Sequence, residues 1–341
     1  MNGLSCLCLG QFLSLTHTLS LHSLSFSCVA PGAGGGGGQV VVDSHEPTTV
    51  PSETPSTMPS ATPSASPITA APVTATNTNS RNDDIRRALV DTLDWLDGTL
   101  DIAETPQNLA FQWITNLDGA NMDPADPFLP QRYALATFFY ASQNAVFDNT
   151  VDWTGPDGSF GWLSETGYCL WAGVVCEENE LAETSFDGNA NVLQLSLERS
   201  NVNGRIPSEL AGLSALQILQ LNTNRMRGTL PPELGRLFEL REFRVKSNDL
   251  TGRLPDDYSN LRNLQVWEAQ FNDLTGTVPE SWGTSLESLS NLRLYKNRLT
   301  GRVPDGLCDL EALRILVTDC NSDNGGTVEC DCCTTCYPKD S

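Results

Sequence analysis

The chain has 341 residues, 39% of them hydrophobic, and a formal net charge of -22. This length allows two domains, and the composition suits a globular protein. A surface this acidic repels phosphate backbones, so we expect no nucleic-acid partner.

Histidine is confined to the amino-terminal region, at His17, His22 and His45. No later residue can supply an imidazole base or ligand, which excludes Ser-His-Asp and Cys-His nucleophile systems from the rest of the chain. We therefore expect no enzyme, no cofactor and no metal.

Residues 1–30 are rich in Leu, Phe and Cys, but Ser, Thr and His interrupt them and no Lys or Arg flanks them. A secretory signal has a positive start and a cleaner apolar core, and a spanning helix needs about 20 mostly apolar residues. Three alternatives stay open for this segment: an unconventional signal, a poor anchor, or no targeting role.

Residues 31–80 predict a disordered linker. The five glycines at 34–38 are not a phosphate loop, because no Gly-Lys-Ser/Thr follows them. The Ser, Thr, Pro and Ala that dominate the rest cannot bury a core. In a secreted protein this segment could be an O-glycosylated stalk.

Residues 81–190 carry nineteen acids and four arginines and predict an acidic helical cap. Asn82 or Asp83 can cap a first helix, whose apolar face would hold Ile85, Leu89, Leu93, Leu96 and Leu100. A second helix is expected from Thr105-Pro106, with a buried face formed by Ala110, Trp113, Ile114 and Leu117. A third is expected after Pro130, with three aromatic side chains for the core: Tyr133, Phe138 and Phe139.

Residues 191–326 contain about six repeats. Their glycines are 24, 24, 24, 25 and 24 residues apart, at Gly204, Gly228, Gly252, Gly276, Gly301 and Gly325. The central repeats fit L-x-x-L-x-L-x-x-N-x-L-x-G, while the end repeats depart from it at Ser200, Thr318 and Asp323. A repeat of this kind forms one short strand and buries its apolar face only by stacking on its neighbours, with atypical repeats at the ends.

A polar residue recurs inside each turn of the repeat. We interpret it as a structural column whose amides satisfy backbone groups of adjacent coils, formed by Asn224, Asn248, Asn272, Asn297 and Asn321. The repeat glycines would permit a backbone turn that a side chain would crowd.

An apolar residue and a proline follow five of the glycines, as in Ile206-Pro207. This G-x-[ILV]-P signature resembles the plant-type leucine-rich repeat (LRR), and CLWAGVVC at 169–176 is similar to the cap that precedes such repeats. With QRYALATFFYAS and the carboxy-terminal CDCCTTC, residues 82–338 resemble the plant-type LRR proteins abundant in diatoms, with receptor-kinase ectodomains and polygalacturonase inhibitors as relatives.

The resemblance implies an α/β fold. The expected architecture is a right-handed solenoid with a short parallel sheet on its concave face and 3-10 or irregular structure on its convex side. A helical cap would precede it, and a Cys-rich cap at 327–341 would follow. The family consists of secreted or membrane-tethered recognition modules. No kinase region or clear spanning helix is recognised in this chain, so membrane attachment and signalling would need a partner.

Eight of the eleven cysteines cluster at two places, one at each end of the repeats, which suggests disulfides in an oxidising compartment. We expect one bond between Cys169 and Cys176. Fifteen pairings are open for the other six, which are Cys308, Cys320, Cys330, Cys332, Cys333 and Cys336. Zinc is the alternative for the last four, although C-x-C-C-x-x-C is not the usual paired knuckle.

The outward positions of the expected strands define a candidate ligand surface, since solenoids commonly bind on the concave face. Its most distinctive part combines cations with an aromatic residue: Arg244, Lys246, Glu268, Gln270, Arg293, Tyr295 and Lys296. We hypothesise that it contacts an acidic glycan or an acidic protein loop. The alternative is ordinary solvated strand charge.

Three functions follow from these observations. The first is an extracellular or cell-surface recognition module that binds a protein or glycan. The second is a secreted inhibitor of a wall-degrading enzyme, and the third is a structural or adhesive protein on a Ser/Thr/Pro stalk.

Overall fold

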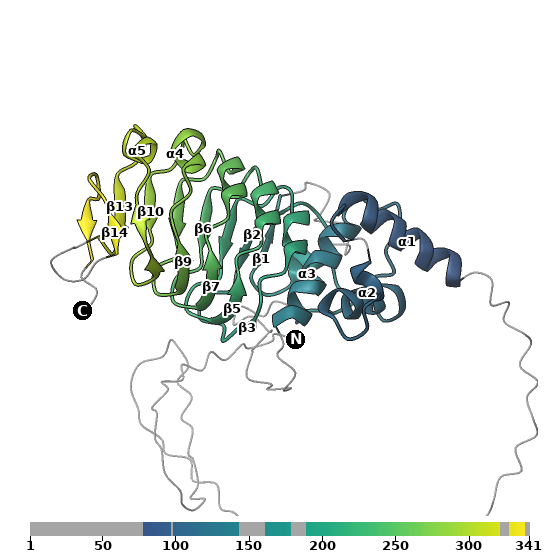
Figure 1. Cartoon of the computed structure of the whole chain (residues 1–341). Helices are drawn as coiled ribbons and strands as arrows, with labels where there is room; N and C mark the ends of the chain where they lie inside the picture. Colours follow the sequence, from purple (N-terminus) through teal and green to yellow (C-terminus); the bar gives the residue numbers. More distant parts are fainter. Residues whose placement is uncertain (1–77, 97, 143–160, 179–188, 321–326, 338–341) are drawn as a thin grey trace, which may run out of the picture. The chain divides into compact units, whose positions relative to one another are not determined.

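The computed structural model describes residues 78–96, 98–142, 161–178, 189–320 and 327–337 (Figure 1). The expectations for residues 1–77, and those for Asn321, Asp323 and Gly325, lie outside the described residues. Within the described ranges, no helix is long and apolar enough to cross a membrane.

Helices form the first part of the described chain: α1 (Thr78–Thr92), η1 (Thr99–Asp101), α2 (Pro106–Asn116) and α3 (Leu129–Ser142). The start of α2 is as predicted, because the Thr105 side chain accepts a hydrogen bond from the Asn108 backbone N–H at 3.2 Å and Pro106 occupies the first turn. Tyr133 and Phe138 are fully buried on α3, and Phe139 is half-buried.

Three details of the helical prediction are wrong. α1 begins at Thr78, so Asn82 and Asp83 lie inside it, and it ends at Thr92. Leu96 and Leu100 are buried as expected, but from a turn and from η1, because α1 has already ended and Gly98, with a left-handed φ of 79°, directly precedes η1. Leu117 is 72% exposed, since it follows α2 as its C-cap and no longer shares the buried face.

A buried ion pair fixes α3 to the segments around it. Arg132 and Asp118 have no exposed side-chain surface, and two guanidinium nitrogens each lie 2.6 Å from a carboxylate oxygen. The remaining guanidinium donors reach the backbone carbonyls of Ser164 and Thr166 at 2.9 Å. The guanidinium also lies 5.1 Å and 5.0 Å from two indole rings, those of Trp113 and Trp171. The charge is thus buried with its donors satisfied, as a buried charge requires.

Two sheets run along the stacked coils (Figure 1), and their strand pairs are parallel except for the first pair of the concave sheet. The concave sheet has the order β1 (Val174–Cys176), β2 (Val192–Ser196), β4 (Ile218–Gln220), β6 (Glu242–Arg244), β8 (Val266–Glu268), β10 (Asn291–Arg293), β13 (Ile315–Thr318), β15 (Thr335–Cys336). The second sheet has the order β11 (Arg298–Leu299), β9 (Asp273–Gly276), β7 (Asp249–Arg253), β5 (Arg225–Thr229), β3 (Asn203–Gly204), and β12 (Gly301–Arg302) pairs with β14 (Val328–Glu329).

The register of the concave sheet follows the sequence period. Leu195 pairs with Leu219 and Leu219 with Phe243, each 24 residues on. All three side chains are fully buried, so the coils share one core. The predicted α/β leucine-rich-repeat solenoid is confirmed.

Short helices form the convex side: η3 (Ser208–Gly212), η4 (Pro232–Arg236), η5 (Asp256–Asn260), α4 (Ser281–Ser285) and α5 (Asp305–Cys308). The repeat prolines Pro207, Pro231, Pro255 and Pro304 cap them at the amino end. The one repeat of 25 residues carries the α-helix α4 in place of a 3-10 helix, so the convex side absorbs the extra residue and the sheet register continues.

A buried carboxyl lies where the helices meet the solenoid. Glu209 of η3 is 1% exposed, and its Oε1 accepts a hydrogen bond from Gln107 of α2 at 3.1 Å. Its Oε2 is buried without a hydrogen-bond partner. Burial therefore raises the pKa of this carboxyl above its ordinary value.

Candidate functional site

The eight cysteines of the caps form four disulfides: Cys169–Cys176, Cys308–Cys332, Cys320–Cys336 and Cys330–Cys333. The first closes the loop that contains η2 (Tyr168–Leu170) and β1, and the other three gather the last coil. Three sulfur atoms, of Cys320, Cys330 and Cys333, lie within 4.8 Å of one another. All three are in disulfides, and a disulfide offers no thiolate to a metal.

The repeat asparagines link neighbouring coils. The Asn248 Oδ1 accepts from the Met226 backbone N–H at 2.9 Å, and its Nδ2 donates to the carbonyls of Leu221 and Val245 at 2.9 and 3.0 Å. Asn224, Asn272 and Asn297 make the equivalent bonds. These amides are occupied by the backbone and are not available to a ligand.

Asp319 binds backbone N–H groups near the last coil, a role that the repeat motif does not indicate. Its two carboxylate oxygens accept the backbone N–H groups of Lys296 and Asn297 at 2.8 and 3.1 Å. In the preceding coils backbone carbonyls accept the corresponding N–H groups. In the sequence, Asp319 could have been singled out as an acidic residue at an outward position of the last, degenerate repeat.

The candidate cations on the concave face surround one buried acid. Glu268 pairs directly with Arg244 on one side and with Arg293 on the other. Its side chain is 6% exposed, and its oxygens lie 3.5 Å from Arg244, 3.8 Å from Lys246 and 3.7 Å from Arg293. Arg244 also contacts Glu242 at 3.0 Å. The three cations therefore face two carboxylates, and the surface is much less basic than its cations alone suggest.

Several polar atoms of this face are buried without a hydrogen-bond partner. Gln270 is 3% exposed and its Oε1 is unpaired, as are the Nε of Arg293 and the Oδ1 of Asn291. Asn222, at the same repeat position two coils before Gln270, is 2% exposed with an unpaired Oδ1. Because an unpaired buried polar atom costs about 1–3 kcal/mol, these atoms favour a bound group that supplies the missing partners.

Aromatic rings border these polar atoms. The Tyr295 ring stacks on Tyr337 at 4.4 Å and meets Phe271 edge-on at 5.3 Å. The Lys296 ammonium lies 5.3 Å from the Tyr337 ring centre. Phe271 is 44% exposed. Phe271 and Tyr337 lie outside the strands that the repeat pattern defines, so the sequence-based search missed them.

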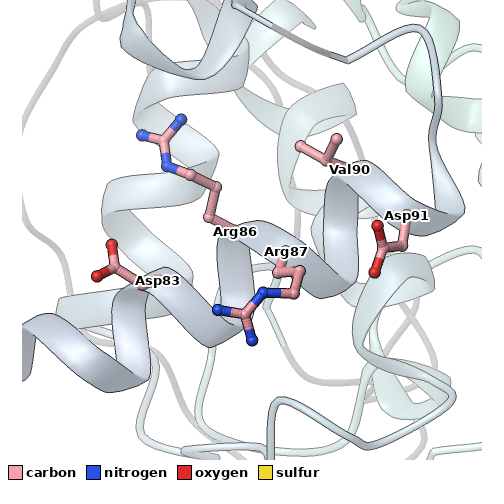
Figure 2. Close-up of a pocket in the computed structure, with 5 residues that line it drawn as sticks. All are labelled: Asp83, Arg86, Arg87, Val90 and Asp91. Carbon is pink, nitrogen blue, oxygen red and sulfur yellow. The ribbon is translucent and has the colours of Figure 1, made fainter.

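A separate hollow lies on α1. Figure 2 shows its five lining residues, which all project from this one helix: Asp83, Arg86, Arg87, Val90 and Asp91. Arg86 is engaged with Asp101 at 2.6 Å and Arg87 with Asp84 at 3.0 Å. Its charged side chains are exposed or half-buried and both arginines are paired, so this hollow carries no candidate site.

Comparisons with known proteins agree with this architecture. The family model described as Leucine Rich Repeat matches residues 288–310. No curated protein matches the chain.

Among solved structures, PEPR1 in the crystal structure of PEPR1–AtPEP1 is 28% identical over 53% of this chain and 23% of its own, with a TM-score of 0.44. The BIR2 ectodomain from Arabidopsis thaliana is 28% identical over 49% of this chain and 76% of its own, with a TM-score of 0.37. A plant ice-binding protein is 24% identical over 56% of this chain and 62% of its own, with a TM-score of 0.37. The chain thus spans less than a quarter of the length of PEPR1. The repeat signature, the register of the two sheets and the family-model match together show that the protein contains a leucine-rich-repeat solenoid.

Proposed function

We propose that the protein is a non-enzymatic recognition module of the extracellular space or cell surface, and that it binds a protein ligand on the concave sheet near β8 and β10. The observation that supports this most strongly is the group of buried, unpaired polar atoms at Gln270, Asn291 and Arg293 beside the exposed aromatic ring of Phe271. Aromatic and Arg side chains are enriched at the energetic centres of protein interfaces.

The buried Glu268 sharpens the expected chemistry of the ligand. A uniformly acidic partner would meet this carboxylate together with the cations around it. We therefore propose a ligand segment with one carboxylate for Arg293 and a hydrogen-bond donor for the Oε1 of Gln270, followed by an apolar side chain against Phe271 and Tyr295. A mixed segment of this kind is a peptide or protein loop.

Four disulfides support the proposed location, because such bonds persist in oxidising compartments. Sequencing the mature amino terminus and locating the protein by immunofluorescence on intact cells tests this part. A reduced protein inside the cell would contradict it.

Binding is tested with proteins captured from the extracellular fraction on immobilised full-length chain, followed by affinity measurement with the purified binder. The double charge reversal Arg244→Glu and Arg293→Glu should weaken that affinity at least tenfold, since truncating a buried charged contact costs about 2–5 kcal/mol. The matched control is Arg241→Glu with Arg314→Glu, two exposed arginines outside the concave strands. Undiminished binding by the concave variant would overturn the proposal.

A further inference from the structure

The outer face of the second sheet differs in composition from the rest of this acidic protein. Its exposed arginines are Arg205, which directly follows β3, and Arg225, Arg227, Arg253 and Arg298, while the exposed Arg302 lies next along the chain on β12, which pairs with β14. Its exposed threonines are Thr229, Thr251, Thr275, Thr277 and Thr300. Two acids, Asp249 and Asp273, lie among them, and the apolar residues of these strands are buried. The face is cationic and rich in hydroxyl groups. Figure 1 labels four of its strands, β3, β5, β7 and β9.

The repeat glycines let alternate arginines lie along this face. A Cβ placed on Gly228 would be 3.3 Å from the Cγ and 3.4 Å from the Nε of Arg205. A Cβ on Gly276 would be 3.1 Å from the Cγ of Arg253. Each arginine therefore lies over the next coil, in space that a glycine leaves open.

Threonine takes the same position in the coils between. The Thr229 Cγ2 lies 2.7 Å from a Cβ built on Gly252, and the Thr277 Cγ2 lies 2.9 Å from one on Gly301. The cationic position thus recurs at every second coil, at Arg205, Arg253 and Arg302. Because neighbouring strands lie about 4.8 Å apart, the repeat of this position is about 10 Å.

A second row of hydroxyls is oriented by the backbone. Thr251 donates to the Gly228 carbonyl at 3.4 Å, Thr275 to the Gly252 carbonyl at 3.2 Å, and Thr300 to the Gly276 carbonyl at 3.5 Å. A hydroxyl whose hydrogen is committed in this way keeps its lone pairs for an outside donor. The row therefore presents acceptors for the hydroxyl groups of a ligand.

The cations differ in how far they are already neutralised. Arg298 contacts Asp273 at 2.8 Å, and Arg302 contacts Asp305 and Asp331. Among the described residues, Arg205, Arg225 and Arg253 make no ion pair. The net charge of -22 does not cancel this local field at physiological salt, because charges more than about 8 Å away are largely screened.

We propose that this arginine–threonine face binds a linear acidic polysaccharide with carboxylate groups. Guanidinium forks match carboxylates in a bidentate manner, and the hydroxyl acceptors suit sugar hydroxyls. In an extended two-fold polyuronate every second carboxylate projects to the same side, which agrees with cations at every second coil. A protein partner fits less well, because the face lacks the exposed aromatic anchors that protein interfaces use.

The test uses the full chain and mannuronate-rich alginate at 0.15 M salt, with affinity measured by biolayer interferometry. The ladder variant Arg205→Gln, Arg253→Gln removes two cations that make no ion pair among the described residues, so it should bind at least tenfold more weakly and show a smaller dependence on salt. The control variant Arg241→Gln, Arg314→Gln removes the same charge from exposed positions elsewhere and should bind as the original does. Propylene-glycol-esterified alginate, which lacks the charges, should not bind.

Three outcomes would overturn the proposal: no alginate binding by the original protein, equal losses in the ladder and control variants, or equal binding of the esterified polymer. The concave variant Arg244→Glu with Arg293→Glu should keep its alginate affinity. The polysaccharide proposal and the proposed protein ligand can therefore fail separately.

Discussion

The helical cap and the solenoid bury polar groups in opposite ways. The cap uses one ion pair, Arg132 with Asp118, whose partners come from segments with no sequence period. The solenoid uses the same amide contact again and again, in each of four described coils. The comparison suggests that the stability of the cap depends on one ion pair that occurs once. In the solenoid, equivalent amide contacts in successive coils share the stabilisation.

The largest effect is expected from breaking the ion pair of the cap. Arg132→Met should lower the free energy of unfolding by about 3–5 kcal/mol, because it leaves the Asp118 carboxylate buried and unpaired. Urea unfolding followed by tryptophan fluorescence measures this loss. The double variant Arg132→Met, Asp118→Leu should recover part of it, and a double variant as unstable as the single one would contradict the explanation.

Removing one amide of the solenoid should cost less. Asn248→Ala leaves the buried Met226 N–H without a partner and removes one of the two amide donors to the Leu221 carbonyl, so it should destabilise the fold by about 2–3 kcal/mol. Asn248→Asp keeps the acceptor but turns a buried carboxylate oxygen toward the carbonyls of Leu221 and Val245, so its loss at neutral pH should be at least as large as that of Asn248→Ala in the same urea titration. Equal stability of Asn248→Ala and the original would show that the amide column is dispensable.

The buried contact of Glu209 in the solenoid with Gln107 in the cap predicts that the stability of the protein depends on pH. The folded pKa of Glu209 is raised above its ordinary value of 4.5, so the folded state binds this proton more tightly than the unfolded state does. The contribution of Glu209 to the free energy of unfolding is fully present below pH 4.5, and it is lost as the pH rises through the folded pKa. Each unit by which the pKa is raised costs about 1.4 kcal/mol at high pH.

Glu209→Gln should remove this dependence. The variant should match the original below pH 4.5 and exceed its thermal stability at pH 8, as measured by scanning calorimetry across that range. Glu239→Gln, at an exposed position of the solenoid, is the control for loss of one carboxylate. If the thermal stabilities of Glu209→Gln and the original differed by the same amount at all pH values, titration of Glu209 would not be the cause of the pH dependence.

The smallest effect is expected from an exposed ion pair of the solenoid. Arg298→Gln breaks the contact with Asp273, which has the same chemistry as the buried pair of the cap and a similar distance of 2.8 Å. Its loss should change the free energy of unfolding by less than about 1 kcal/mol, because water already solvates both charges. A loss near that of Arg132→Met would mean that burial does not explain the difference between the two pairs.

The difference between the periodic contacts of the solenoid and the unrepeated contacts of the cap also explains which features could be predicted from the sequence. Leu219 and Asn248 recur with the period of one coil, so their roles follow from spacing alone. Arg132 and Asp118 show no period, and their pairing depends on how α3 packs. On the concave face the positions of the strands could be predicted from the sequence, but the net charge of the surface could not. Glu268 is buried between Arg244 and Arg293, and this neighbourhood follows only from the strand register. Phe271 was missed because it follows the strand in a left-handed conformation with φ of 60°.

The antiparallel strand β1 has a consequence for solubility. A stack of parallel coils ends in a row of unpaired backbone groups that could accept another molecule in the same register. At the amino-terminal side of β2 this row is paired with β1, which runs the other way and is held inside the Cys169–Cys176 loop. An incoming coil would meet a short, reversed and covalently closed strand instead of a matching template. The cap thereby limits growth of the sheet from one molecule into the next.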